Sequence, residues 1–517
     1  MTITTTEVGL RKRAIPLAAA LMVMLAAPLA RAEWKFTPTV TLRQTYTDNV
    51  ALARDELAEG RFVTEISPGF GLVNNSRRFK LRTAYQLNYY AFDDQDAPQT
   101  KHTQNQLSAD LRSILIDDLL LFDAAASVGQ QAVSAFGPAV NGNAYATANR
   151  ANVRTWRMGP TLRHDFGTSA TALVRYTHDE VDAGSSGLGA TRSDNLSASL
   201  ASGPTLRKFG WDVGYSRQQL DDTRAPESTV QNASIGLRWQ MLQALQFNLR
   251  GGYDEYDYQS LEGPTKGNFW QFGMVWEPSS RSSLRASVGK RYYGDSYSLE
   301  ARHRSRRTVW SINYNDEVTT TRAQFFQPAT VDTAAMFDSL FQTGIRDPAQ
   351  RRLARDRYLR ETGLPPALAE NVNYFSNRYI LQKRWQAAVV LNSARSTAVL
   401  SLFDVRRDAL SASQTDGAIT GPVNLDINDN TRQRGASALF NYRISSRSGV
   451  NLALTSSTSL SQSTGIETDN KVARLSLTRQ FSPRTAGDLE LRRTSGAAIG
   501  NATYRENALS ASISMRF

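Results

Sequence analysis

Apolar and polar residues alternate with a period of two along most of the chain. This period places the apolar side chains on one face of a strand and the polar side chains on the other. The alternating segments are close to the ~9–11 residues that a tilted strand needs to cross a membrane. The clearest of them begin at Trp34, Phe79, Trp156, Phe209, Ala233, Trp270 and Leu475. The pattern predicts an all-β protein.

Short connections alternate with long polar ones. The short ones, rich in turn-forming residues, fall at 74–76, 117–118, 203–204, 278–280, 304–306, 445–447 and 482–484. The long ones fall at 93–102, 131–148, 179–193, 408–429 and 461–469. This alternation is typical of outer-membrane barrels, with short periplasmic turns and longer extracellular loops. We predict a transmembrane antiparallel β-barrel over residues 33–517, with about 22 strands and a range of 20–24.

The last eleven residues form an alternating strand that ends on an aromatic side chain. Its apolar face carries Leu509, Ala511, Ile513 and Met515, and Phe517 closes it. Outer-membrane barrels commonly end this way, so Phe517 is expected to be the signal that the barrel assembly machinery reads.

The first 32 residues resemble a secretory signal peptide. Arg11, Lys12 and Arg13 precede an apolar run that ends in Ala30-Arg31-Ala32, a small-x-small cleavage site. The run is interrupted by prolines and is short against the ~20 residues of a spanning helix. The first strand is expected directly after the cleavage site, which predicts a barrel without an N-terminal plug domain.

One connection, 318–371, is too long for a structureless loop. It is expected to be a partly folded extracellular loop with a helix near 348–362, because Asp347 fits an N-cap and Pro348 the first helical position. The helix would be strongly basic, with Arg351, Arg352, Arg355, Arg357 and Arg360. It would gate a wide lumen, or else be a solvated helix that binds lipopolysaccharide or nothing.

Composition narrows the functional classes. The chain has no cysteine and a mean hydropathy of −0.41, which excludes a disulfide scaffold and a helical membrane protein. The net charge is +12, of which the first 32 residues carry +3 from four cations and one acid, leaving +9. The sequence has no nucleic-acid-binding motif. We expect the partners to be outer-membrane lipid, lipopolysaccharide and an anionic polysaccharide.

Basic residues stand opposite the apolar face of many predicted strands, so the lumen is expected to be net positive and to attract anions. The set is Arg43, Lys80, Arg82, Arg157, Arg238, Arg250, Arg285, Arg291, Arg378, Arg384, Arg474 and Arg492. The alternative is that each of them pairs with an acid on a neighbouring strand. Aromatic residues near strand ends, such as Tyr256, Tyr258 and Tyr292, are expected to form an interfacial girdle, with stacking on sugar rings as the alternative.

Nothing in the sequence indicates an enzyme. The four histidines show no paired ligand spacing, and neither HExxH nor GxSxG occurs. We therefore expect no catalytic residues, no metal site and no cofactor.

Several short motifs resemble those of the outer-membrane β-barrel family associated with exosortase/PEP-CTERM systems. They are Trp34 with Pro38, Tyr46-Thr47-Asp48-Asn49-Val50, Ile66-Ser67-Pro68-Gly69, Arg291-Tyr292-Tyr293-Gly294-Asp295-Ser296-Tyr297, Arg304-Ser305-Arg306-Arg307 and Trp310. The resemblance implies the extracellular polysaccharide and protein-sorting context of a Gram-negative bacterium.

Three functions fit these features. The first is a conduit or docking component for extracellular polysaccharide export. The second is an anion-preferring porin for small solutes. The third is a structural anchor whose surface loops bind polymer or sorted proteins.

Overall fold

A computed structural model describes residues 34–93, 103–138, 149–184, 189–223, 226–261, 263–326, 331–332, 367–368, 378–411, 427, 430–498 and 502–517. The predicted signal peptide and the five arginines expected near 348–362 lie outside these residues. In the part of the chain described, no helix combines the length and apolar character needed to cross a membrane.

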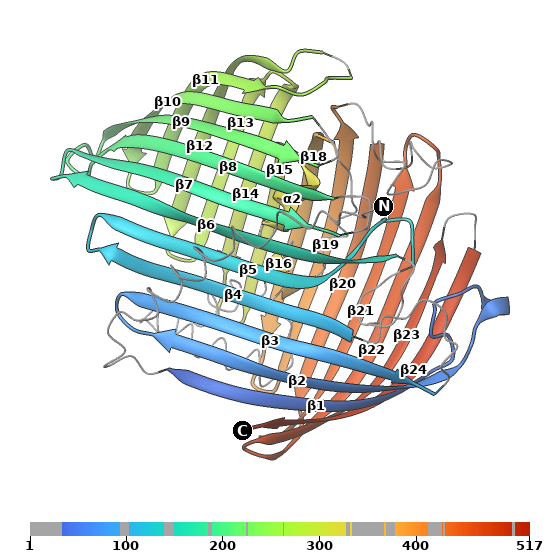
Figure 1. The fold of residues 1–517 in the computed structure, drawn as a ribbon. Helices are drawn as coiled ribbons and strands as arrows, with labels where there is room; N and C mark the ends of the chain where they lie inside the picture. Colours follow the sequence, from blue (N-terminus) through green and yellow to red (C-terminus); the bar gives the residue numbers. More distant parts are fainter. Residues whose placement is uncertain are drawn as a thin grey trace, which may run out of the picture.

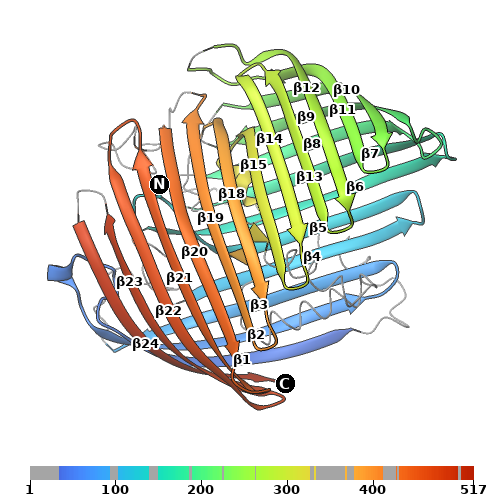
Figure 2. The same ribbon diagram turned by 180° about the vertical axis from the view of Figure 1, so that it is seen from behind.

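Twenty-two strands form one closed antiparallel sheet (Figures 1 and 2), which confirms the predicted barrel and strand number. Each strand pairs with the next in the chain, and β1 pairs with β24 to close the ring. Closure leaves no sheet edge exposed, which a barrel in lipid requires.

The strands range from 10 to 17 residues in length, so most are longer than a membrane crossing needs. The first eleven are β1 Lys35–Thr47, β2 Arg61–Asn75, β3 Phe79–Phe92, β4 Thr103–Ile116, β5 Leu120–Ala132, β6 Arg150–Phe166, β7 Ala170–Asp182, β8 Ala190–Ser202, β9 Phe209–Asp222, β10 Ser228–Leu242 and β11 Leu245–Tyr256. The others are β12 Lys266–Ser279, β13 Ser282–Arg291, β14 Gly294–Arg304, β15 Thr308–Thr319, β18 Ile380–Asn392, β19 Ser396–Ala409, β20 Asn430–Arg443, β21 Ser448–Ser461, β22 Glu467–Ser482, β23 Thr485–Ala498 and β24 Ala502–Arg516.

The remaining elements are small. η1 is a 3-10 helix at Asp55–Leu57, α2 is a helix at Thr321–Phe325, and β16 Val331–Asp332 pairs with β17 Ala367–Leu368. β15 continues to Thr319, so the boundary predicted at Val318 is wrong: Val318 and Thr319 pair with Leu381 and Ile380. The connection between β15 and β18, residues 320–379, is called the gate segment below, after the gating role predicted for it above.

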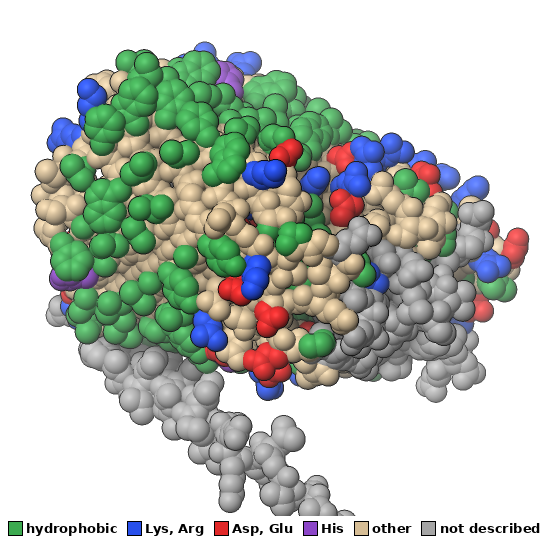
Figure 3. Space-filling model, turned by 90° about the horizontal axis from the view of Figure 1, so that it is seen from above, with side chains coloured by type: hydrophobic (Ala, Val, Ile, Leu, Met, Phe, Trp, Pro, Cys, Tyr) green, Lys and Arg blue, Asp and Glu red, His purple; other side chains and the backbone are tan. Residues whose placement is uncertain are grey.

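The apolar face of each strand points outward. Leu42, Leu237, Leu402 and Leu491 are about half exposed although they sit in regular strands. An exposed apolar band of this kind is what a barrel presents to lipid. Apolar side chains cover much of the face in Figure 3, and charged side chains gather toward one side of it. The chain therefore has the fold and surface of an outer-membrane β-barrel.

The buried residues lie mainly at the end of the barrel where the long connections are, which is the extracellular end by the loop-length rule. We call this end of the lumen the mouth. Phe136, in the connection after β5, has no exposed surface and packs with Ile427, from the connection after β19, and with Ile466, from the connection after β21. These connections start from separate parts of the ring, so they fold over the mouth.

Candidate functional site: the occluded mouth of the lumen

Helix α2 lies inside the barrel (Figure 1). The chain enters it directly from β15, and Thr320 forms the N-cap, because its side-chain oxygen accepts a hydrogen bond from the backbone N–H of Ala323 at 3.2 Å. Thr321, Arg322 and Gln324 are all buried. A five-residue helix is not stable alone in water, so contacts with the barrel wall must hold it.

The first contact is an ion pair between α2 and a distant strand. Nη1 of Arg322 donates to Oδ1 of Asp179 in β7, and both side chains are less than a tenth exposed. β7 stands eight positions before β15 in the ring. The pair therefore connects the start of the gate segment to a different wall of the barrel.

Burial lowers the pKa of Arg322 to about 10. The guanidinium is therefore still charged at physiological pH. A buried cation needs a partner to offset its lost hydration, and the carboxylate of Asp179 supplies one.

Aromatic side chains make the second contact. Phe325 and Phe326 pack against the buried apolar cluster formed by Ala151 and Val153 of β6 and by Val181 and Ala183 at the end of β7. The guanidinium carbon of Arg157, one of the predicted lumen residues, lies 5.5 Å from the Phe326 ring centre. This is within the range of a cation–π interaction.

The third contact is a row of polar side chains on the inner wall. Nε2 of Gln324 donates to Oε1 of Gln382 in β18 at 3.3 Å, and the same oxygen accepts from Nε of Arg407 in β19 at 3.1 Å. Arg407 also donates to Oε1 of Gln433 in β20 at 2.8 Å, and Gln433 donates to Ser459 in β21 at 3.3 Å. We call this row the inner polar ladder. It joins α2 to four successive strands.

A tyrosine cluster covers another part of the mouth. The rings of Tyr258 and Tyr379 stack with centres 4.7 Å apart, and the Tyr379 hydroxyl is 2.7 Å from that of Ser228. The ring centres of Tyr256 and Tyr292 lie 5.0 Å apart. Burial raises the pKa of Tyr258 and Tyr379 above that of free tyrosine, so both phenols are neutral. These side chains contact one another across strands at the mouth, which differs from the lipid-facing girdle expected of Tyr256, Tyr258 and Tyr292.

The predicted basic set is placed on the inner wall. Each of its strand residues has the opposite parity to the exposed apolar side chains of the same strand, and Arg378 lies buried just before β18. These strand residues are Arg43, Lys80, Arg82, Arg157, Arg238, Arg250, Arg285, Arg291, Arg384, Arg474 and Arg492. Whether the wall they form selects anions stays a prediction.

Arg250, Arg285, Arg291 and Arg492 of this set are paired with acids on nearby strands. Arg250 bonds to Asp212 at 2.7 Å and Arg291 to Asp254 at 2.7 Å. Arg285 lies 3.4 Å from Glu277 and 3.3 Å from Glu300, and Arg492 bonds to Glu506 at 2.8 Å. For these residues the structure has the pairing with neighbouring acids that the alternative describes, and a net positive lumen stays a prediction.

Arg384 of β18 differs from these four. Its Nε and Nη2 atoms are buried and make no hydrogen bond. It lies one inward position below Gln382 of the inner polar ladder. This places it directly beneath the occluded mouth.

Sequence reasoning missed α2, Asp179 and the inner polar ladder. The one local signal for α2 is Thr320, a favourable N-cap residue at the end of a strand. Phe517 lies at the end of β24, where its N–H donates to the Pro38 carbonyl at 3.0 Å; its role in assembly stays a prediction. Among the described residues, no group of three or more His, Cys, Asp or Glu side chains is placed to hold a metal ion.

No family model and no curated protein matches the chain. Among solved structures, it is similar to the siderophore receptor PirA from Pseudomonas aeruginosa, with 10% identity, a TM-score of 0.44, and coverage of 94% of this chain and 81% of that one. It is also similar to the siderophore receptor PirA from Acinetobacter baumannii, with 10% identity, a TM-score of 0.46, and coverage of 93% of this chain and 80% of that one. The likeness to OccK8 (OprE) from P. aeruginosa has 7% identity, a TM-score of 0.33, and coverage of 94% of this chain and 98% of that one. Likenesses this low do not indicate what this chain does.

Proposed function

We propose that this outer-membrane barrel is a gated conduit and that the gate segment closes its lumen. The observation that carries the proposal is the buried contact between Arg322 of α2 and Asp179 of β7. A surface loop would stay on its own side of the barrel. This one crosses to another wall and is bound there.

The contacts that hold α2 are suited to a reversible gate. They include the Arg322–Asp179 ion pair and the packing of Phe325 and Phe326, both on the β6–β7 part of the wall, and the hydrogen bond from Gln324 to Gln382 on β18. Elements that move in function have few stabilising contacts compared with the strands around them. Release of α2 would leave the closed strand pairing of the barrel intact.

The passenger that we propose is an extracellular polysaccharide, exported in the exosortase/PEP-CTERM context that the sequence resemblance implies. Tyrosine rings stack on sugars, and Tyr258, the partly exposed member of the stacked Tyr258–Tyr379 pair, would present a ring at the mouth. Inward arginines such as Arg157 and Arg384 would attract acidic sugars. In this function the chain acts as a conduit and does not catalyse a reaction.

The direct test compares the conductance of the refolded barrel in planar bilayers with that of a variant in which residues 320–378 are replaced by a short turn. The intact protein is expected to be mostly closed and the variant open. Steady current in both would contradict a gate. The residue limits keep all of β15 and β18, so that the barrel wall is unchanged.

A cross-link provides the complementary test. Because the chain has no cysteine, Asp179→Cys with Arg322→Cys can be joined by a short thiol-specific linker without side reactions. The linked protein should stay closed under applied voltage, and cleavage of the linker should restore opening. Loss of secreted polysaccharide from bacteria lacking the protein is the corresponding cellular result, and unaltered secretion would contradict the proposed passenger.

The second candidate is an anion-preferring porin, which the unsatisfied guanidinium of Arg384 favours. It predicts steady, anion-selective current in the intact protein, and reduced selectivity after Arg384→Gln. The third candidate is a structural anchor, which the packing of Phe136, Ile427 and Ile466 over the mouth favours. It predicts no current with or without the gate segment.

A further inference from the structure

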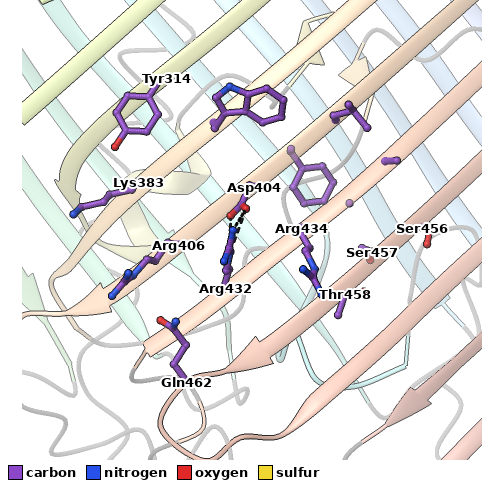
Figure 4. A pocket seen from close by; sticks show the side chains of 15 residues that line it. Tyr314, Lys383, Asp404, Arg406, Arg432, Arg434, Ser456, Ser457, Thr458 and Gln462 are labelled. Atoms are coloured by element: carbon purple, nitrogen blue, oxygen red, sulfur yellow. Dashed lines mark hydrogen bonds and ion pairs between the residues drawn. The ribbon is translucent and has the colours of Figure 1, made fainter.

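We propose that the outer face of β18–β21 binds a phosphorylated glycolipid of the outer leaflet. The site is a hollow of about 890 Å³ on the outside of the barrel, near its extracellular end (Figure 4). Lys383, Arg406, Arg432 and Arg434 line it together with one acid, Asp404. This basic cluster lies on the opposite side of the barrel wall from the lumen discussed above.

The outward direction follows from strand parity. On β19, Asp404 and Arg406 share their parity with Leu400 and Leu402, which are 45% and 52% exposed and belong to the apolar band. On β18, Lys383 shares its parity with Trp385, which is 38% exposed. The side chains therefore project from the barrel exterior.

The strand register places like charges side by side. Lys383 pairs directly with Arg406, and Arg406 pairs directly with Arg432. Like charges directly opposite on neighbouring strands are destabilising. Three adjacent cations on an outer wall therefore indicate a site arranged to hold an anionic ligand.

Nearby acids neutralise only part of this charge. Asp404 accepts hydrogen bonds from Nε of Arg432 at 3.1 Å and from its Nη2 at 2.5 Å. Asp408 accepts one from Nε of Arg406 at 3.0 Å. On β15, which neighbours β18, both carboxylate oxygens of Asp316 accept hydrogen bonds, one from the hydroxyl of Ser296 and one from the N–H of Tyr297, each at 2.8 Å. Arg406 and Arg432 remain about half exposed, so both present further N–H donors outward. Arginine recognises phosphate through several N–H groups at once.

The position of the cluster along the barrel axis favours a lipid over a soluble anion as the ligand. Below the cations, toward the periplasmic end of the same outward face, the wall turns apolar. Trp385 lies one outward position below Lys383 on β18, Leu402 lies two outward positions below Arg406 on β19, and Leu454 lies below Ser456 on β21. A headgroup phosphate held by the cations would thus have acyl chains lying over the apolar band. A free phosphate would gain nothing from that band.

Hydroxyl and amide groups favour a sugar headgroup. Ser456, Thr458 and Gln462 line the side of the hollow opposite Lys383 (Figure 4). Ser456 and Gln462 supply neutral donors and acceptors, and the Thr458 hydroxyl, which donates to Oδ1 of Asp469 at 2.6 Å, can still accept a hydrogen bond. A saccharide needs such groups more than a glycerol phosphate headgroup does. The hollow is also in the ~300–1,000 Å³ range of small-molecule sites, which is larger than one phosphate requires.

The test measures bound lipid by native mass spectrometry of the barrel released from vesicles that contain lipid A, monophosphorylated lipid A or phosphatidylglycerol. The altered protein carries Lys383→Gln, Arg406→Gln, Arg432→Gln and Arg434→Gln. Arg192→Gln with Arg217→Gln is the matched control, because both are exposed, outward-facing arginines near the extracellular end of β8 and β9. Arg432→Lys with Arg434→Lys keeps the charge and covers the case in which the fourfold variant does not fold.

The expected result is retention of lipid A by the native protein and by the control, with at least a tenfold loss in the fourfold variant. Monophosphorylated lipid A should bind less well, and the arginine-to-lysine variant should show a smaller loss than the fourfold variant. Equal retention by the fourfold variant would overturn the site. Retention of phosphatidylglycerol equal to that of lipid A, or displacement of lipid A by millimolar inorganic phosphate, would overturn the assignment to a glycolipid.

Discussion

The substitution Asp179→Asn tests the gate most directly. It keeps the size of the side chain and removes its charge, leaving the buried Arg322 of α2 without an anionic partner. While α2 is docked, the unpaired cation stays buried. When α2 is released, the cation is hydrated again, so the substitution favours the open form.

The magnitude follows from burial. Both side chains of the pair are less than a tenth exposed, and removing one partner of a buried ion pair costs about 3–5 kcal/mol. Since about 1.4 kcal/mol corresponds to a factor of ten, the ratio of closed to open conduits should fall by roughly two to four orders of magnitude. The double variant Asp179→Asn with Arg322→Met removes the unpaired charge and should recover much of the closed population.

The assay is the open probability of single barrels in planar bilayers. Arg112→Gln is the matched control, since Arg112 pairs with Asp123 on the adjacent strand at 2.9 Å, remains exposed, and does not touch α2. It should leave the open probability unchanged. If Asp179→Asn behaves like this control, or if the double variant is as open as the single one, the ion pair does not hold the gate.

Three further results are expected. Arg407→Leu should lower the free energy of unfolding in urea by about 1–3 kcal/mol for each ladder amide left unpaired. Arg407 is buried and donates to two such amides, those of Gln382 and Gln433. An unchanged midpoint of urea unfolding would show that water replaces the guanidinium. Phe136→Ala removes a fully buried ring and should cost about 3–5 kcal/mol of packing at the mouth. The loss is measured as faster proteolysis of the connection after β5. Cleavage at the same rate in the variant and the native protein would contradict the packing. The open probability should not vary between about pH 6 and 9. Arg322 is the one titratable residue of α2, and its lowered pKa of about 10 leaves it protonated in both the docked and the released form. Opening therefore exchanges no proton at Arg322 in this range. A change in open probability across that window would identify another titrating group.

The architecture was predictable from sequence because a barrel strand carries its own signal. Every second residue faces lipid, so segments such as that from Phe209 through Trp211 to Val213 reveal strand and face together. Turn-forming residues at 117–118 and 482–484 mark the short connections where the structure has them. Counting these signals gave the 22 strands of the closed sheet.

The inner wall was predictable only as a set of positions. Parity placed Arg250 and Arg291 on that wall, but not beside Asp212 and Asp254. Those pairings depend on the register between neighbouring strands, which a single sequence does not encode locally. Whether the inner wall is net positive depends on those pairings and stays a prediction.

The gate and the lipid cluster depended on tertiary structure for the same reason. Arg322 and Asp179 are far apart in the chain, and only closure of the ring brings α2 to β7. Lys383, Arg406 and Arg432 look like ordinary surface charges until antiparallel pairing aligns them in one row. Sequence by itself determined the alternation and hence the barrel, because those signals are local. Closure and register decided which distant side chains meet, because they fix distances that no local pattern contains.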